Sequence, residues 1–542
     1  MPPAGIAFEA SYNLLHEPLI GWRDVALGDQ HQGSLPEVLA ALAADQVRDF
    51  PRLRVHQRHP WHAFLVQLAA IALHRAGQSE PWHSADDWCA ALRALTPDHP
   101  DDAPWCLVAP SDRPALLQAP VDGVMDDWEI SVHTPDRLDM IGTSKNHDLK
   151  RARMRIAKPE DWLFALVSLQ TQAGSNSGSY KGISRMNSGA GSRPGVGVAQ
   201  KGNFGKRWFT DLNFLQESRK LITKDFGFLE ANGIDLVWMK PWNGVSSIPF
   251  EVLDPYYIEI CRRIRITFDG LRFSAYTAKT PISRIEENAL RKGVTGDPWT
   301  PINKEESKIM AIPRSGFGYE LISKFLFFDG LYKYGATQSV ANWPDGVILE
   351  LICQGIAPDG NSKTSGYHER RVPISPKLRL RMMGAQRPLL AKLAKNRIQA
   401  IADMRKLLWN SLALLFANGE NKRGDDAVND RASRFAQPFE QQEDARFFDD
   451  LTLQAEAEDG QQDAIYLQWL LGLADRAEAV LRQAFDAGPR SGMQRYKAQS
   501  AALSRFHAGL RGGKKPPFPE LVVHYAALRT KRASVSEGET HV

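Results

Sequence analysis

The chain has 542 residues, of which 43% are hydrophobic and 24% are charged, with 41 glycines and 33 prolines. These values are close to the averages of globular proteins and exclude a collagen, a coiled coil and a wholly disordered chain. The length predicts two to four domains, each able to bury its own core, and the net charge of +4 by itself says little about partners.

The sequence also indicates a cellular compartment. It contains no window of about 18 apolar residues without a charge, and its first residues lack the basic and then apolar pattern of a secretion signal. The four cysteines are dispersed, without a CxxC pair, so we expect neither a disulfide framework nor a structural zinc site. We therefore expect a protein of the reducing cytoplasm.

The N-terminal third begins with a strand-like run over 12–22, and a helix is predicted after Ser34. The Ser34 side chain can cap that helix, and Pro36 suits its first turn. Residues 62–75 (HAFLVQLAAIALHR) are nearly all apolar and predict a buried helix.

Five histidines lie near this second helix, and three of them form the run His56-x-x-His59-x-x-His62. Two residues of such a run can face one side of a helix and bind a metal ion. No HExxH pattern and no matching carboxylate accompanies the run, so we do not expect a metal site here.

Positive charge is concentrated in residues 141–207. This segment holds twelve Lys and Arg against three Asp and Glu, a net charge of +9, which leaves −5 for the rest of the chain. Lys and Arg displace counterions from phosphates, and small residues let the backbone approach closely. The segment is therefore a candidate surface for a polyanion, although a solvated surface loop has the same composition.

A predicted apolar helix over 162–172 divides this basic segment into two loops, 141–158 and 173–207. The second loop contains nine glycines and no acidic residue. Its sequence GSNSGSYKGISRMNSGAGSRPGVGV matches neither the GxxxxGK[ST] of a Walker motif nor a GxGxxG between a strand and a helix, so it does not predict a nucleotide site. The glycines instead indicate close contacts or unusual φ angles.

Strands are predicted in the middle of the chain, at 233–238, 262–268, 271–276 and 347–353. The second and third flank Asp269-Gly270, the pattern of a hairpin with a type I′ turn. The hairpin carries Arg262, Arg263, Arg265 and Arg272, and Lys279 follows it. These side chains either face phosphates or protect a sheet edge from pairing.

After Arg371 the pattern becomes helical. Apolar residues recur every three or four positions over 401–415 and 465–480, and Asn418-Gly419 predicts the end of the first of these helices. A third helix is predicted over 493–510, and 444–457 is a weaker, acidic fourth. Long helices joined by short polar links predict an up-and-down bundle. We expect the tail after Ser534 to be disordered.

Five motifs in a characteristic order carry a resemblance over about residues 10–525. They are Tyr12-Asn-Leu-Leu15, His59-Pro-Trp-His-Ala-Phe-Leu-Val-Gln-Leu68, GSYKGISRMNSGAGSRP, Gly296-Asp-Pro-Trp-Thr-Pro301 and Lys363-Thr-Ser-Gly-Tyr-His-Glu-Arg-Arg371. Together they resemble the CasA family, the large subunit of Cascade, the type I-E CRISPR RNA-guided surveillance complex.

The resemblance implies an α+β fold, with a mixed α/β N-terminal domain over 1–372, a C-terminal four-helix bundle over 373–533 and a disordered tail over 534–542. It also implies a subunit of antiviral defence that has no catalytic residues, metal or cofactor. Such a subunit recognises the protospacer-adjacent motif (PAM) in double-stranded DNA and starts strand separation and R-loop formation. The implied partners are the CRISPR RNA guide complex with its backbone and other subunits, the target DNA, and a helicase-nuclease that is recruited after target binding.

The resemblance also implies site residues. Three elements are expected to face the PAM from the minor groove: a glycine loop at 174–181, a wedge loop at 361–366, and a lysine finger, Lys279, with Arg284 as its rival. The wedge has Lys363 and Thr364 where other members place a glutamine, and the glycine loop has serines and an asparagine in place of a plainer glycine run. The implied PAM residues are Asn176, Ser177, Gly178, Ser179, Tyr180, Lys181, Lys279, Lys363, Thr364 and Ser365, and the implied contacts with the guide complex, within 144–155, are Lys145, Asn146, Lys150, Arg151 and Arg153.

A nucleic-acid hydrolase is an alternative from another class of function. Its active centre would be the histidine run at 56–62 or His368-Glu369, which we expect in a turn. Two-metal nucleases need clustered carboxylates and HNH nucleases need a His/Asn/His set, and neither pattern is present at a suitable spacing. A helical scaffold that binds only protein is a third possibility.

Overall fold

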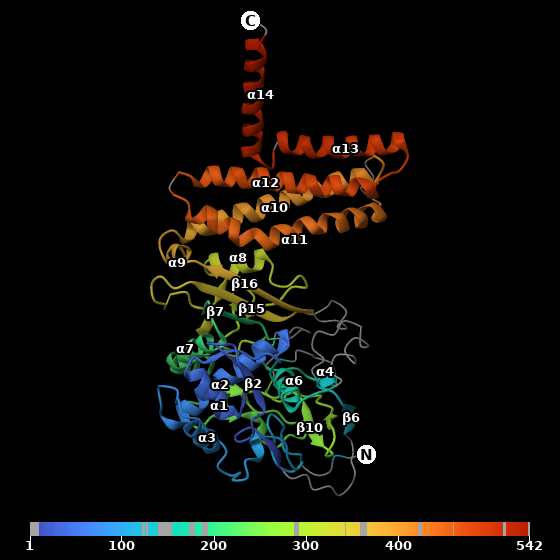
Figure 1. The fold of residues 1–542 in the computed structure, drawn as a ribbon. Helices are drawn as coiled ribbons and strands as arrows, with labels where there is room; N and C mark the ends of the chain where they lie inside the picture. The colour runs from blue at the N-terminus through green and yellow to red at the C-terminus, as the bar shows by residue number, and fades with distance from the viewer. Residues whose placement is uncertain are drawn as a thin grey trace. The chain divides into compact units, whose positions relative to one another are not determined.

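The computed structural model describes residues 10–121, 125, 128–138, 154, 156–172, 179–186, 193–286, 292–341, 343–357, 366–420, 425–458, 460–512 and 516–539. They belong to two compact units (Figure 1). Unit 1 comprises Met1–Phe317 and Asp329–Pro376, and unit 2 comprises Gly318–Phe328 and Lys377–Val542. The chain thus enters unit 2 briefly, at helix α8 (Tyr319–Phe327), before it enters that unit again after Pro376.

Two long helices, α2 (Arg58–Ala76) and α7 (Phe204–Phe226), pack against each other in unit 1. All α2 residues from His59 to Leu73 are buried, because a helix that is apolar on every side must be covered all round. This helix was predicted over 62–75 and is confirmed. We did not predict α7, although Asn203 caps its start and Gly227 ends it with a φ of 76°, both ordinary helix signals.

The shorter helices of unit 1 are α1 (Leu35–Ala43), α3 (Ala85–Ala94), α4 (Pro135–Leu138) and α6 (Pro159–Gln172). The predicted cap of α1 is confirmed, because the Ser34 side chain accepts a hydrogen bond from the Glu37 amide while the Glu37 carboxylate accepts one from the Ser34 amide. Such a reciprocal pair satisfies two amides that a helix start otherwise leaves without partners.

The strands of unit 1 form several small sheets, of order β1-β5, β3-β2-β4, β8-β9, β10-β11-β6, β13-β12-β14 and β16-β15-β7. Only the β8–β9 pair among them is parallel. The strands are β1 (Ser11–Asn13), β2 (Ile20–Asp24), β3 (Gln30–Gly33), β4 (Val47–Asp49), β5 (Cys106–Val108), β6 (Glu129–Val132), β7 (Gly195–Gln200), β8 (Ile234–Leu236), β9 (Leu253–Ile258), β10 (Arg263–Phe268), β11 (Phe273–Ala278), β12 (Ile302–Asn303), β13 (Lys308–Ile309), β14 (Tyr332–Lys333), β15 (Leu349–Ala357) and β16 (Gly366–Ile374).

Strand β15 is the centre of its sheet and pairs with a strand on each side. It pairs antiparallel with β7 from Leu349 opposite Gln200 to Gln354 opposite Gly195. It pairs with β16 up to Ala357 opposite Gly366. The start of β7, the end of β15 and the start of β16 therefore lie at one end of this sheet.

The hairpin at Asp269-Gly270 is confirmed, as β10 and β11, but its turn type is not the predicted one. Phe268 pairs with Phe273, so Gly270 and Leu271 are the central residues of the turn. Gly270 has a φ of 91°, whereas Asp269 and Leu271 lie outside the positive-φ region, so the turn lacks the two consecutive positive φ values of type I′. The Asp269 carboxylate accepts hydrogen bonds from the amides of Leu271 and Arg272 and holds this turn.

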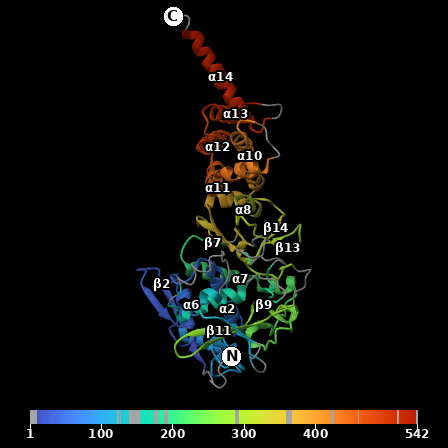
Figure 2. The same cartoon turned by 90° about the vertical axis from the view of Figure 1, so that its right-hand side faces the viewer.

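Unit 2 contains the predicted helical bundle. Helix α10 contacts α11, α12 and α13, and these helices run side by side (Figures 1 and 2). Asn418 and Gly419, with φ values of 59° and 81°, follow the end of α10 as predicted. The helices are α9 (Pro376–Met383), α10 (Arg387–Phe416), α11 (Asp426–Glu456), α12 (Gln462–Gln483), α13 (Gly492–Arg511) and α14 (Pro519–Glu539).

Two features of unit 2 differ from the sequence-based expectation. Helix α11 has 31 residues and begins at the cap of Asp425, which accepts from the amides of Ala427 and Val428, where a weak helix was expected only over 444–457. Within α11, buried Glu443 binds Arg476 and Asp444 accepts the amide of Tyr319. Helix α14 extends to Glu539, so residues 534–539 continue a helix where we expected disorder. No helix in the described part of the chain combines the length and the apolar character that crossing a membrane requires.

The histidine run at 56–62 belongs to the core of unit 1. His62 Nε2 lies 2.7 Å from the Asp211 carboxylate on α7, and burial lowers the pKa of His62 to about 4. His59 is buried without a hydrogen-bond partner among the described residues, and burial lowers its pKa well below the ordinary value. Within the described ranges, no three His, Cys, Asp or Glu side chains are arranged to hold a metal ion.

A buried ion pair joins the start of β7 to the Gly296–Pro301 turn. Both oxygens of Asp297 accept hydrogen bonds from the Arg193 guanidinium, and both side chains are almost completely buried. Burial would raise the pKa of Asp297, but Arg193 and Arg185 outweigh it and the pKa is lowered. The pair is therefore ionised, and each charge depends on the other.

We expect Arg193→Ala to lower the free energy of unfolding by about 3–5 kcal/mol, because the Asp297 charge stays buried without a partner. Urea unfolding followed by tryptophan fluorescence measures this loss. The control is Lys333→Ala, which removes a half-exposed pair with Asp225 and should cost less than about 1 kcal/mol. Similar small losses in both variants would contradict the expectation.

Candidate nucleic-acid interface

The loop expected to contact the guide complex, with Lys145, Asn146, Lys150, Arg151 and Arg153, lies outside the described residues. The structure does describe the helices on either side of it, α4 and α6. Both helices are held by one short segment of the chain, residues 52–54.

The segment 52–54 binds carboxylates at both ends of this loop, one on α4 and two at the start of α6. Arg54 Nη1 lies 2.6 Å from Asp136 on α4. Arg52 donates to both oxygens of Asp161, in the first turn of α6, at 3.1 and 2.5 Å, and lies 2.9 Å from Glu160. The three carboxylates are almost fully buried, so these ion pairs fix where the basic loop begins and ends.

Helix α6 separates the basic loop from the glycine-rich loop. Its 14 residues span about 21 Å at a rise of about 1.5 Å per residue. The basic loop precedes its first residue and the glycine-rich loop follows its last. Two positively charged loops are thus held at opposite ends of one buried helix.

The described end of the glycine loop pairs with the chain at the predicted lysine finger. Asn176, Ser177 and Gly178 lie outside the described residues, and Ser179, Tyr180 and Lys181 lie within them. Tyr180 and Thr280 form a parallel bridge. The Lys181 amide donates to the Thr280 carbonyl and the Thr280 amide to the Ser179 carbonyl, each at 2.9 Å.

Four basic residues gather around this bridge, and we call them the Lys279 cluster: Lys181, Arg262, Arg263 and Lys279. Lys279 is exposed and immediately precedes Thr280, while the other three are half-buried. Arg262 donates to the Lys181 carbonyl and, at 2.9 Å, to the Cys261 carbonyl, and its guanidinium lies 5.8 Å from the centre of the Tyr180 ring. Arg262 thereby fixes the glycine loop beside Lys279.

The backbone of Gly244 packs closely against the backbone of Lys279. Gly244 has a φ of 86°, and a Cβ atom at this position would lie 3.0 Å from the Lys279 carbonyl oxygen. Only glycine adopts this conformation without strain and leaves that space. The Lys279 backbone is therefore held on a rigid base while its side chain faces solvent.

Two other arginines proposed for nucleic acid are used inside the protein. Arg284, the rival for the lysine finger, is buried, donates to the carbonyls of Lys240 and Pro241, and has its pKa lowered to about 10 by burial. Arg265 is also buried and donates to the carbonyls of residues 109, 110, 113 and 118. Neither guanidinium is available for a phosphate. Lys279 is therefore a better candidate for the lysine finger than Arg284.

The far end of the glycine-rich loop returns to the sheet beside the wedge loop. Gln172, the last residue of α6, donates to the Arg193 carbonyl at 2.5 Å. A Cβ atom on Gly355 would lie 3.5 Å from Pro194 Cα, so β15 passes close to this return point. Lys363, Thr364 and Ser365 lie outside the described residues, in the connection from Ala357 to Gly366. The structure thus brings the described flanks of both loops to one end of the sheet.

The expectation that His368-Glu369 lies in a turn is wrong, because both residues are in β16, opposite Gly355 and Gln354. Glu369 binds Arg371 and accepts the Tyr367 hydroxyl. The ion pair between Glu369 and Arg371 is typical of a structural role. Among the described residues, His368 and Glu369 are not part of a group that could hold a metal ion.

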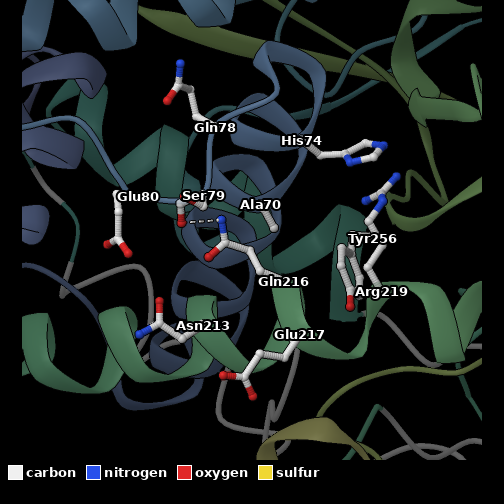
Figure 3. Close-up of a pocket in the computed structure, with 10 residues that line it drawn as sticks. All are labelled: Ala70, His74, Gln78, Ser79, Glu80, Asn213, Gln216, Glu217, Arg219 and Tyr256. Atoms are coloured by element: carbon white, nitrogen blue, oxygen red, sulfur yellow. Dashed lines mark hydrogen bonds between the residues drawn. The ribbon is translucent and has the colours of Figure 1, made fainter.

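A cavity of about 520 Å³ lies between α2, α7 and β9 (Figure 3). Three of its polar side chains bind groups of the protein: Gln216 donates to the Ser79 carbonyl, Arg219 binds Asp254, and the Tyr256 hydroxyl donates to the Leu215 carbonyl. Burial, together with Arg219, lowers the pKa of His74 beside it. The cavity is lined by Glu80 and Glu217 as well as by Arg219, so its lining is not the positive surface that a nucleic acid requires.

Comparison with known proteins adds evidence of fold only. No family model and no curated protein sequence matches the chain. The CRISPR-associated protein Cse1 from Acidimicrobium ferrooxidans superposes with a TM-score of 0.60 at 15% identity, covering 92% of this chain and 98% of that one. Thermus thermophilus CasA (Cse1) gives 0.61 at 13% identity with the same coverage, and Thermobifida fusca Cse1 gives 0.58 at 15% identity, covering 92% and 97%.

These matches extend over both units of the structure and nearly the whole of each matched chain. The α+β class and the C-terminal helical bundle that the sequence resemblance implies are confirmed. The chain has the fold of the Cse1 (CasA) proteins.

Proposed function

We propose that this chain belongs to the CasA family and is the large subunit of a type I-E RNA-guided DNA surveillance complex. The observation that carries the proposal is the Cse1 fold over 92% of the chain, together with the five sequence motifs in family order. In such a complex base pairing with the guide supplies most of the specificity, so the protein needs to read only a short PAM.

The proposed PAM reader consists of the Lys279 cluster, the glycine loop and the wedge loop. Lys279 projects from a fixed backbone, so its ammonium can donate to the N3 and O2 acceptors that all A·T orientations share on the minor-groove floor. Ser179, Tyr180 and the rest of the glycine loop would supply donors without bulk, which a groove about 6 Å wide requires. Lys363, Thr364 and Ser365 would enter between the first base pairs of the target and start strand separation.

The basic loop with Lys145, Asn146, Lys150, Arg151 and Arg153 is the proposed contact with the guide complex. In the chain this loop precedes α6 and the glycine loop follows α6, so we assign the two loops to two different partners. Unit 2 would serve as the dock for the helicase-nuclease. The ion pairs that engage His62 and Glu369 favour a chain without catalysis over the alternative hydrolase.

The proposal predicts that the purified chain joins a guide complex. Mixed with a CRISPR RNA and the backbone subunits of a type I-E complex from the same source, the chain should co-elute with them in size-exclusion chromatography. The assembled complex should bind a PAM-containing duplex at least about tenfold more tightly than the complex without this chain, because the PAM contacts are absent there. Equal binding with and without the chain, or failure to co-elute, would overturn the assignment.

We expect Lys279→Ala to weaken binding of PAM-containing duplex by about 5–30-fold, from the loss of one groove contact. Binding of a duplex without the PAM should change by less than about twofold. Fluorescence anisotropy of the assembled complex measures both values, and Lys224→Ala, an exposed lysine on α7, is the control. Equal weakening on both duplexes would show that Lys279 acts as a general phosphate contact.

Arg52 and Arg54 should affect assembly indirectly, because they hold the ends of the basic loop and are not themselves the proposed contacts with the guide complex. Arg52→Gln with Arg54→Gln leaves Asp136 and Asp161 without their partners, so the two ends of the basic loop are no longer fixed. We expect about a 10-fold loss of affinity for the guide complex with PAM selectivity retained. Arg75→Gln, which breaks an ion pair with Asp235 elsewhere in unit 1, should assemble normally. A parallel loss of PAM selectivity in the double variant would indicate general unfolding instead.

A further inference from the structure

A cavity of about 320 Å³ in unit 1, which we call the arginine pocket, has a different lining from the sites described above. Five elements, β2, β4, α2, α7 and β16, each contribute one arginine to it. These are Arg23, Arg48, Arg58, Arg207 and Arg371, and the carboxylates that line the cavity are Asp49 and Glu350. No residue of the Lys279 cluster lines it.

Two of the five arginines are neutralised by the protein. Arg23 binds both oxygens of Asp49, at 2.7 and 2.8 Å. Arg371 binds Glu350 at 2.8 Å and Glu369 at 3.0 Å. These contacts hold the two guanidinium groups in place. They also pair the carboxylates at the pocket, Asp49, Glu350 and Glu369, with Arg23 and Arg371.

The other three arginines keep unused donors. Arg48 lies 3.4 Å from Asp49, whose oxygens already bind Arg23. Arg58 lies 3.6 Å from the nearest oxygen of Glu369, beyond a hydrogen bond. Each guanidinium has five N–H groups, so both can bind a further acceptor.

Arg207 is the third, and it is the most buried of the five, with 11% of its side chain exposed. Its nearest carboxylate, Asp211, is 4.0 Å away and already accepts from His62 and from Trp299. Arg207 Nη2 has no hydrogen-bond partner among the described residues. Burial lowers the pKa of Arg207, so an anion in the pocket would stabilise a charge that the protein leaves largely uncompensated.

The start of α7 adds to the positive potential of the pocket. Gly202, Asn203 and Phe204 line the cavity at the N-terminus of this 23-residue helix. Aligned peptide dipoles give the N-terminus of a long helix about half a positive charge. The helix start and the guanidinium groups with unused donors therefore both favour an anionic ligand.

We propose that the arginine pocket binds a backbone phosphate of a nucleic-acid strand. The guanidinium fork matches two phosphate oxygens, and Arg48, Arg58 and Arg207 line the cavity from three different elements, β4, α2 and α7. Arg48 and Arg58 at its rim are 42% and 47% exposed, so a ligand continues out of the cavity in the manner of a strand. The site goes beyond the proposed function, because it uses residues outside the PAM reader and the basic loop.

The test compares two double variants of the full chain that each remove two positive charges. Arg48→Gln with Arg58→Gln alters the pocket. Arg482→Gln with Arg495→Gln removes two exposed, carboxylate-paired arginines from α12 and α13. Fluorescence anisotropy with a labelled 12-nucleotide strand, as RNA and as DNA of the same sequence, measures affinity at several salt concentrations, and calorimetry with pyrophosphate measures small-anion binding.

We expect the pocket variant to bind at least one of the two strands about 5–10-fold more weakly, with a salt slope smaller by about 1, while the control changes by less than about twofold. Equal losses in both variants, or no loss in either, would overturn the proposal. Pyrophosphate binding that disappears in the pocket variant while strand binding stays the same would also overturn it, in favour of a small phosphate ligand. The isolated chain suffices for this test, so its outcome is independent of assembly into a complex.

Discussion

The antiparallel pairing of β7 with β15 is the constraint on which the candidate interface depends. Because Gly195 pairs with Gln354, the glycine-rich loop has to return to the sheet where β15 runs into its own loop. The buried pair of Arg193 and Asp297 fixes this return point, since moving either charge would leave the other uncompensated in the core. A strand register and one ion pair thus bring together the described flanks of two loops that are far apart in the sequence.

The interface combines fixed loop ends with loops that carry small or charged residues. On one side of α6, residues 52–54 bind the carboxylates at the ends of the basic loop. On the other side, Arg262 and the Tyr180–Thr280 bridge fix the end of the glycine loop. Rigid elements that position variable loops are the usual way in which a fold carries a binding site. Buried ion pairs therefore hold the ends of the basic loop in place.

Local signals predicted the local features well. The Ser34 cap, the all-apolar α2, the hairpin at Asp269 and the end of α10 follow from residues a few positions apart, and the structure confirms them. The sequence could not indicate that Arg265 is buried, because the carbonyls that bind it lie about 150 residues away in the chain. The same holds for the strand at His368-Glu369, which pairing with β15 creates. The order of the motifs predicted the fold, whereas only the structure shows that Ser179–Lys181 and Lys279 are neighbours.

The placement of α8 has a consequence for the order in which the chain can fold during its synthesis. This helix of nine residues belongs to unit 2 and contacts α10 and α11, but unit 1 both precedes and follows it. Its first amide binds Asp444, a residue 125 positions later, and so short a helix is not stable alone in water. As the chain leaves the ribosome, unit 1 therefore folds with an inserted segment whose apolar residues Ile322, Phe325 and Leu326 are not fully covered until α10 and α11 have been made. Newly made chains would pass through a stage at which this segment is the natural target of a chaperone.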